Sequence, residues 1–316
     1  MAKIGTDISV AAEFLQTGVI GIPTETVYGL AGNALSIDRV TEIFEVKNRP
    51  VFDPLIVHVA SVDAALDLVK EIPEKLRILA EHFWPGPLTL LLEKKDVIPD
   101  LVTSGLSRVA IRVPAHPLTL ELLRSIPFPL AAPSANPFGY ISPTTAYHVN
   151  DQLGEKIPYI LDGGPSAVGL ESTIIGLENN RPHIYRLGGL PAESIFNIIG
   201  ECSIKQSSAN PAAPGMLDSH YSPRKPLFIG DVNELIRNHA GKSILILGFG
   251  QVVINNPEIK VLNLSTSGNI NEAAANLFKM MRLADANPEE IIIADLLPEV
   301  GLGRAINDRL KRAAIK

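Results

Sequence analysis

The sequence predicts an α/β protein of two domains, and three observations lead to this class. Short apolar runs typical of buried strands alternate with segments whose apolar residues recur at helical spacing. Some strand-like runs in the first 200 residues follow each other directly, which favours a mixed sheet over a strictly parallel one. The pattern then lapses into a stretch with four prolines between Pro211 and Pro226. We therefore expect a first domain over residues 1–200, a linker over 201–226 and a second domain over 227–316.

The elements of the first domain follow from their patterns. Apolar, β-branched runs predict strands, and these runs cover residues 19–22, 55–59, 88–92, 109–113, 159–161 and 172–175. Ser36 has the position of an N-cap for a helix whose residues Val40, Ile43 and Phe44 fall on one face. Ser142 followed by Pro143 predicts another helix start.

The second domain alternates more regularly. Strands are expected at residues 227–229, 244–247, 261–262 and 291–294, and helices at 232–239, 270–284 and 304–314. This alternation predicts a small α/β domain. The last helix carries five basic residues, Arg304, Arg309, Lys311, Arg312 and Lys316. They could contact RNA or a partner enzyme, but we favour a solvated basic face.

Composition excludes several classes of protein. The net charge of −6 argues against a histone-like or ribosomal basic protein. The single cysteine, Cys202, excludes a disulfide framework within one chain and suits a reducing cytoplasm. No apolar stretch approaches the roughly 20 residues of a membrane helix, so we expect no membrane association.

Basic residues mark candidate anion sites. Arg108 and Arg112 share one face of their predicted strand, so together they either grip phosphate or carboxylate oxygens or lie solvated. Lys47 and Arg49 precede a strand, at a sheet end where α/β folds bind ligands, although a lysine there also complements a helix dipole. His58, alone on its strand, is as a rule a core residue.

No standard nucleophile or nucleotide motif is present. The chain lacks a Gly-x4-Gly-Lys-Ser/Thr loop, a complete Gly-x-Gly-x-x-Gly fingerprint, a Gly-x-Ser-x-Gly elbow and a His-x3-His pair. This pattern favours a site that positions reactants over one that attacks them.

Eight ordered strings within residues 10–200 together resemble the threonylcarbamoyl-AMP synthase (YrdC-like) family. They are Pro-Thr-Glu-Thr-Val-Tyr-Gly-Leu at 23–30, Phe-Glu-Val-Lys-Asn-Arg-Pro at 44–50, Pro-Leu-Ile-Val-His at 54–58, Phe-Trp-Pro-Gly-Pro-Leu-Thr at 83–89, Ala-Pro-Ser-Ala-Asn at 132–136, Ser-Pro-Thr-Thr-Ala at 142–146, Leu-Asp-Gly-Gly at 161–164 and Glu-Ser-Thr at 171–173. Pro-Gly-Met at 214–216 and His-Tyr-Ser-Pro at 220–223 resemble the longer, two-domain members. Asn48 departs from the family, which often has glycine there.

The resemblance implies a fold and a reaction. The fold is an N-terminal YrdC-like domain with a twisted mixed sheet and a concave basic site, followed by a smaller Rossmann-like α/β domain. The reaction joins L-threonine, bicarbonate and ATP into threonylcarbamoyl-AMP, with Mg²⁺ accompanying the ATP. A downstream enzyme then transfers the threonylcarbamoyl group to tRNA, giving threonylcarbamoyladenosine, and direct tRNA contact stays open.

The resemblance also implies site residues. Lys47 and Arg49 match the catalytic basic pair. Nucleotide contacts are implied for Arg49, Asp53, Arg108, Ser134, Asn136, Ser142 and Arg186. The threonine pocket is implied for Thr26, His58, Arg112, Ala132 and Ser172. Tyr221 matches a lid residue, and no protein ligand for the metal is implied.

Two other functions compete with this one. A carbamoyl-transfer module that acts on carbamoyl phosphate belongs to larger proteins with cysteine-rich zinc modules, which this chain lacks. A non-catalytic RNA-binding or ribosome-assembly factor could use the same basic hollow, but net acidity and the absence of interleaved aromatic residues disfavour it.

Overall fold

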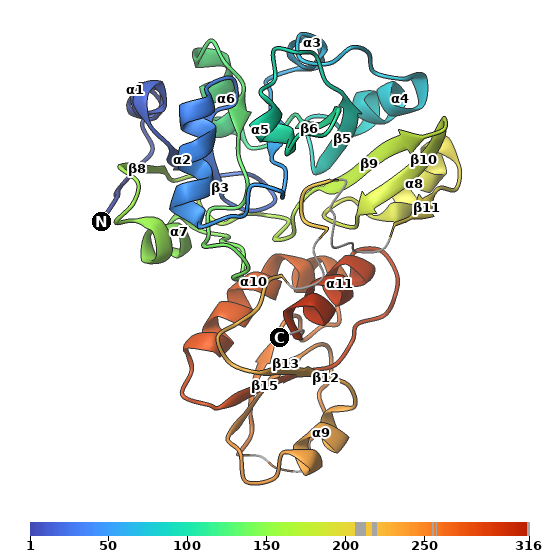
Figure 1. Ribbon diagram of the computed structural model, residues 1–316. Coiled ribbons are helices and arrows are strands. Elements are labelled where there is room, and N and C mark those ends of the chain that lie inside the picture. The colour runs from blue at the N-terminus through green and yellow to red at the C-terminus, as the bar shows by residue number, and fades with distance from the viewer. Residues whose placement is uncertain (206–212, 217–219, 255, 257, 315–316) are drawn as a thin grey trace.

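The computed structural model describes residues 1–205, 213–216, 220–254, 256 and 258–314. Parts of the predicted linker, residues 206–212 and 217–219, and the terminal Lys316 therefore lie outside the described residues. The chain forms two α/β units, a larger one from residues 1–204 and a smaller one below it in Figure 1. The first unit thus includes residues 203 and 204, which were predicted to belong to the linker.

The first unit is built on a mixed sheet, as the sequence predicted. Its strand order is β1-β8-β2-β3-β7-β4-β6-β5-β9-β10-β11. The strands are β1 (Lys3–Gly5), β2 (Ile20–Ile22), β3 (Gly29–Asn33), β4 (Ile56–His58), β5 (Leu88–Glu93), β6 (Arg108–Arg112), β7 (Leu130–Ala131), β8 (Tyr159–Leu161), β9 (Thr173–Glu178), β10 (Arg181–Arg186) and β11 (Ser203–Ile204).

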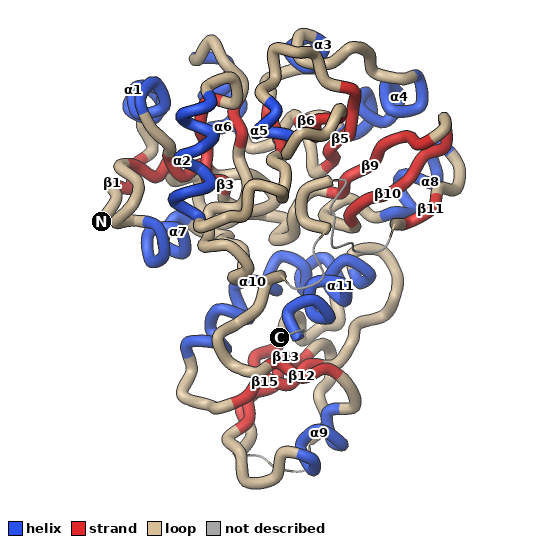
Figure 2. Tube along the Cα trace, in the orientation of Figure 1, coloured by secondary structure: helices blue, strands red, loops and turns tan. Residues whose placement is uncertain are grey.

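Helices cover both faces of this sheet, as Figure 2 shows. They are α1 (Ile8–Thr17), α2 (Ile37–Lys47), α3 (Val62–Leu66), α4 (Glu74–Phe83), α5 (Asp100–Thr103), α6 (Pro117–Ser125), α7 (Ala146–Leu153) and α8 (Ala192–Ile199). Helix α2 begins as predicted, because the Ser36 hydroxyl accepts a hydrogen bond from the Arg39 amide at 3.4 Å. Its apolar side, with Val40, Ile43 and Phe44, enters the main core.

One predicted helix start is wrong. Helix α7 begins at Ala146, and its cap is Thr145, whose side chain accepts a hydrogen bond from the His148 amide. Ser142 donates its hydroxyl to Glu171 instead. Because its hydroxyl bonds a buried carboxylate across the fold, Ser142 is not available as a cap.

The second unit is a four-stranded parallel sheet in the order β12-β15-β13-β14. Its strands are β12 (Leu227–Ile229), β13 (Ile244–Gly248), β14 (Lys260–Asn263) and β15 (Ile291–Ala294), and its helices are α9 (Val232–Asn238), α10 (Ile270–Ala286) and α11 (Gly303–Ala314). All seven elements were predicted from the sequence.

Alternate residues of this small sheet enter two different cores. Leu245 and Leu247 of β13 pack with α10 and α11, whereas Ile244 and Ile246 pack against residues of α9. Helices α10 and α11 therefore lie between the small sheet and the first unit, which they contact directly (Figure 1).

Candidate functional site

The pocket that gathers most of the expected site residues lies between the first unit and the linker. Strands β4 and β6 are parallel and in register, so their last residues, His58 and Arg112, lie side by side at the carboxyl edge of the sheet. The free volume is only about 50 Å³, because side chains and the linker fill it. The lining residues are Thr24, Thr26, Val27, Gly29, Arg49, Pro54, Ile56, His58, Arg112, Ala132, Pro133, Ser134, Glu171, Ser172, Arg186, Pro214, Gly215, His220 and Tyr221.

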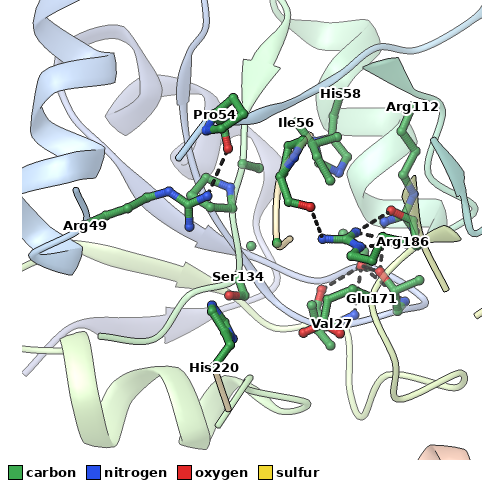
Figure 3. A pocket seen from close by; sticks show the side chains of 18 of the residues that line it. Val27, Arg49, Pro54, Ile56, His58, Arg112, Ser134, Glu171, Arg186 and His220 are labelled. Atoms are coloured by element: carbon green, nitrogen blue, oxygen red, sulfur yellow. Dashed lines mark hydrogen bonds between the residues drawn. The ribbon is translucent and has the colours of Figure 1, made fainter. Parts of the chain in front are cut away.

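Of the residues implied by the resemblance, nine line this pocket. They are Thr26, Arg49, His58, Arg112, Ala132, Ser134, Ser172, Arg186 and Tyr221. Figure 3 shows Arg49 reaching in from one side and Arg112 and Arg186 from the other. Cationic groups therefore lie on opposite sides of the same small space.

Arg112 is buried and fixed by three acceptors. Its guanidinium donates to the Gly86 carbonyl at 3.1 Å, to the Thr26 hydroxyl at 2.9 Å and to the Glu25 carboxylate at 2.6 Å. The guanidinium plane is thus held in one orientation beside the pocket. Glu25 neutralises its charge in this state.

His58 is neutral beside Arg112. Burial, followed by the Arg112 charge, lowers the pKa of His58 to about 3. Its Nδ1 atom has no hydrogen-bond partner among the described residues. A buried imidazole with a free ring nitrogen can accept or donate a hydrogen bond to a bound molecule.

Arg49 and Arg186 approach the pocket from different elements. Arg49 forms a 2.8 Å ion pair with Asp53 and donates to the Pro54 carbonyl at 2.9 Å. Arg186 donates to the Ser172 hydroxyl at 3.1 Å and to the Ser172 carbonyl at 2.9 Å. Burial lowers the pKa of Arg186 to about 10, so it stays cationic at neutral pH.

Four further residues implied by the resemblance lie behind the lining and brace it. The Lys47 ammonium donates to the carbonyls of Ser134 and Asn136. Asn136 donates its amide to the carbonyls of Pro137 and Tyr140. Lys47, Asp53, Asn136 and Ser142 are all buried, yet none of them lines the pocket.

Neither alternative weighed for Arg108 and Arg112, a shared anion or solvated side chains, describes this structure. Arg108 lies at the other end of β6, donating to the Leu177 carbonyl at 3.2 Å and the Tyr185 hydroxyl at 2.9 Å. Four residues of extended strand span roughly 13 Å, which separates the two guanidinium groups although they share a face. Arg108 is therefore absent from the lining of the pocket.

The linker covers the pocket through its described residues. Pro214 accepts a hydrogen bond from Arg186 at 3.3 Å, and the Gly215 amide donates to Asp53 at 3.5 Å. Tyr221 is buried, with a left-handed backbone (φ 66°), and its ring lies 5.5 Å from that of Phe278 in α10. The residue expected as a lid thus lies over the site and against the second unit.

Several lining residues are not among those that the resemblance assigned to the site. Thr24 donates to the Val27 carbonyl at 2.6 Å, and His220 and Glu171 also line the pocket. Each belonged to a string that the sequence had singled out, so the strings carried the signal. Which residue of each string faces the pocket depends on backbone geometry, which the sequence pattern does not specify.

The expected solvated face of the last helix is wrong for Arg309 and Arg312, whereas Lys311 is exposed as expected. Arg309 is completely buried and Arg312 is 5% exposed. Arg309 pairs with Glu171 at 3.1 Å, and the Tyr221 ring lies 5.0 Å from the Arg312 guanidinium. Because α11 packs against the first unit, part of its basic side is an interface and not a solvated surface.

Neither a ready-made metal cage nor a membrane helix is found in the described ranges. No group of three His, Cys, Asp or Glu side chains is arranged to hold a metal ion among the residues described. Glu171, which lines the pocket, uses its two carboxylate oxygens on Ser142 and Arg309. No described helix combines the length and apolarity that crossing a bilayer requires.

Both units match known protein families. Residues 13–188 match the Sua5/YciO/YrdC family, described as "Telomere recombination", and residues 190–315 match "Threonylcarbamoyl-AMP synthase, C-terminal domain". The chain is 41% identical to the threonylcarbamoyl-AMP synthase of Pyrococcus abyssi, over 97% of this chain and 94% of that protein. It is 39% identical to the Bacillus subtilis protein of the same name, over 96% and 91%.

A solved structure agrees with these matches. The crystal structure of P. abyssi Sua5 complexed with L-threonine has a TM-score of 0.91 with this chain. The two are 39% identical, and the match covers 99% of this chain and 97% of that one. The similarity thus includes both units and their arrangement.

Proposed function

The chain belongs to the Sua5/YciO/YrdC family of threonylcarbamoyl-AMP synthases in its two-domain form, and we infer that it makes threonylcarbamoyl-AMP. Its substrates are L-threonine, bicarbonate and ATP, and pyrophosphate is the second product. The product serves the threonylcarbamoyl modification of tRNA. The observation that carries this proposal is the placement of Arg49, on one side, and of Arg112 and Arg186, on the other, around one pocket that His58 also lines.

We assign the threonine subsite to the Arg112 side. The Arg112 guanidinium pairs with the threonine carboxylate, displacing or sharing its bond to Glu25. His58 and the hydroxyls of Thr26 and Ser172 supply neutral hydrogen-bond partners, and Ala132 lines the wall. A neutral His58 adds no second positive charge that would repel the threonine amine.

We assign the nucleotide to the space between Arg49 and Arg186, which enter the pocket from opposite sides. Both guanidinium groups are buried and cationic, which suits triphosphate oxygens. Ser134 contacts the nucleotide directly, whereas Lys47, Asp53, Asn136 and Ser142 hold the walls of the subsite in place. We propose that Arg108 contacts the nucleotide only in a conformation with a more open pocket.

The chemistry needs no protein nucleophile. The threonine amine and bicarbonate give a carbamate with loss of water, and a carbamate oxygen then attacks the α-phosphorus of ATP. The bond between that phosphorus and the β-phosphate bridging oxygen breaks, and pyrophosphate carries away the electron pair. The protein contributes positioning and cationic stabilisation of the charge that develops on the phosphates.

The linker completes the site. With about 50 Å³ free, the pocket is too small for ATP, so the linker segment with Pro214, Gly215 and Tyr221 moves aside to admit substrates. When it returns, it keeps water from the labile product. This assigns Tyr221 the role of a lid residue.

Mg²⁺ enters with ATP in this proposal. Phosphate oxygens and water would hold it, because Glu171, the carboxylate that lines the pocket among the described residues, is already paired. The ion supplies charge neutralisation to the triphosphate. We place the reaction in the cytoplasm, where a separate enzyme takes up threonylcarbamoyl-AMP and transfers its acyl group to tRNA.

The test is pyrophosphate release from ATP by the purified protein with bicarbonate. We expect release that requires both L-threonine and Mg²⁺, and a fall of at least about a hundredfold in kcat/KM for Arg49→Ala, because a buried phosphate contact is lost. Arg124→Ala, an exposed arginine of α6, is the matched control. If pyrophosphate release did not depend on threonine, the proposal would be rejected and a binding protein would be favoured.

A further inference from the structure

Arg309 belongs to the second unit, but its side chain lies beside the pocket of the first. Its Nε and Nη2 atoms donate to Oε2 of Glu171 at 3.2 and 3.1 Å. Its Nη1 atom donates to the Leu187 carbonyl at 2.7 Å, one residue beyond Arg186. The Tyr221 ring lies 5.3 Å from the same guanidinium. One side chain thus contacts the pocket wall, the end of β10 and the linker.

The ion pair between Arg309 and Glu171 affects the pocket because Glu171 is one of its lining residues. It lines the pocket next to Arg186, and its second oxygen accepts the Ser142 hydroxyl at 2.6 Å. Burial opposes its ionisation, but the charges of Arg309 and Arg186 and the Ser142 hydrogen bond keep its pKa below the usual value. A carboxylate therefore lies permanently at the side of the pocket where the triphosphate is proposed to bind.

An unpaired carboxylate at this place would repel ATP. Arg186 carries a single positive charge, so it cannot by itself neutralise both Glu171 and phosphate oxygens. Arg309 has no exposed surface and directs two donors at Glu171. It also pairs with Asp308 at 2.8 Å, so its charge is shared by two carboxylates and does not meet a ligand from solvent.

We propose that Arg309 is a positioning residue of the ATP subsite, which neutralises Glu171 and holds the Ser142 and Arg186 walls in place from the second unit. The inference rests on the proposed function, since it concerns the nucleotide side of that same pocket. It gives the C-terminal unit a defined part in the reaction. Docking of α11 delivers the guanidinium, so the ATP subsite is complete only when the two units are together.

The experiment measures KM and kcat for ATP-dependent pyrophosphate release by Arg309→Met in the full-length chain. Because the charge of Glu171 is then unpaired near the phosphates, KM for ATP should rise about tenfold or more, with a smaller change in KM for threonine. Lys311→Met, on the same helix but exposed and paired with Glu299, is the control and should match the wild type.

A second substitution separates charge from packing. In Glu171→Gln/Arg309→Met neither partner is charged, so KM for ATP should return to within about threefold of the wild type. Arg309→Lys, which keeps the charge, should lie between the wild type and Arg309→Met. Thermal unfolding of each variant identifies any that fails to fold, and the double variant and the lysine variant then decide the question.

The outcomes are distinct. An Arg309→Met enzyme that folds and keeps a normal KM for ATP would overturn the inference. So would a double variant no better than Arg309→Met, because the loss would then come from packing alone. If the wild type itself showed no threonine-dependent pyrophosphate release, the proposed function would fail, and calorimetric ATP binding to the same variants would still test Arg309.

Discussion

At the scale of single residues, the site depends on burial that keeps each group in one charge state. His58 is buried beside Arg112 and is neutral, with its pKa lowered to about 3. Arg112 is buried but remains cationic between Glu25 and Thr26. A neutral imidazole beside a fixed cation gives a polar surface that selects an anionic group on one side and a neutral group on the other.

The low pKa of His58 makes a prediction about stability. Below pH 6.5 the imidazole of His58 binds a proton in the unfolded state but not in the folded state. Keeping His58 neutral therefore costs no free energy of folding above pH 6.5, and stability falls as the pH is lowered towards 3. His58→Gln should therefore reduce the slope of unfolding free energy against pH by about 1.4 kcal/mol per pH unit between pH 4 and 5.5.

Urea unfolding of the wild type and His58→Gln at several pH values measures this slope. His148 and His220, whose pKa values are also lowered, stay in both proteins, so the difference isolates His58. Equal slopes in the two proteins would mean that His58 is not held neutral in the folded state.

At the scale of elements, the end of α2 sets the position of the basic loop. Asn48 caps the helix with a left-handed backbone (φ 52°, ψ 43°), so the chain turns directly from Lys47 into Arg49. Lys47 then holds the loop at Ser134 and Asn136. The asparagine that departs from the family's common glycine is compatible with this geometry, because asparagine tolerates the left-handed region.

The cap makes a prediction about the cost of other residues at position 48. Asn48→Ala should lower the free energy of unfolding by about 1–2 kcal/mol, because alanine has a side chain that opposes a positive φ. Asn48→Gly should stay within about 0.5 kcal/mol of the wild type. Chemical unfolding of the three proteins compares them, and an alanine variant as stable as the glycine variant would contradict the assigned cap.

At the scale of the whole molecule, the two units contact each other through hydrogen bonds and close packing near the pocket. Arg282 of α10 donates to the Ser142 carbonyl at 3.3 Å and to Gln152 at 2.9 Å. Tyr140 donates to Asp285 at 2.6 Å. Gly169 lies against α10, where an added Cβ would come within 2.5 Å of the Ala274 carbonyl oxygen. The position of Arg309, and with it the proposed ATP subsite, depends on this fit.

Gly169 therefore predicts a coupled loss of stability and ATP affinity. Gly169→Ala combines a positive φ of 74° with a backbone clash, and should lower the free energy of unfolding by about 2–4 kcal/mol and raise KM for ATP. Gly164→Ala has a similar φ of 77° but nothing within 4 Å, so it should cost only about 1 kcal/mol. If the two variants lost equal stability and activity, the effect of Gly169→Ala could not be attributed to the docking of the two units.

Prediction from the sequence succeeded best where a pattern is local. The strands and helices of the second unit follow from apolar periodicity, and all of them were placed. Strands β1, β3, β7, β10 and β11 of the first unit were missed. Of these, β3 contains two glycines and β7 is only two residues long. Pairing with neighbouring strands supplies the hydrogen bonds that their own propensity does not predict.

The sequence by itself determined the class of fold, the family and the set of strings from which the pocket is built. Those features depend on local periodicity and on the order of motifs along one chain. Tertiary structure alone decided which residue of each string faces the pocket, why Arg112 lies within it and Arg108 outside, and that α11 contributes a buried arginine. These outcomes depend on contacts between segments more than a hundred residues apart, such as Glu171 and Arg309, and burial then sets the charge of each group.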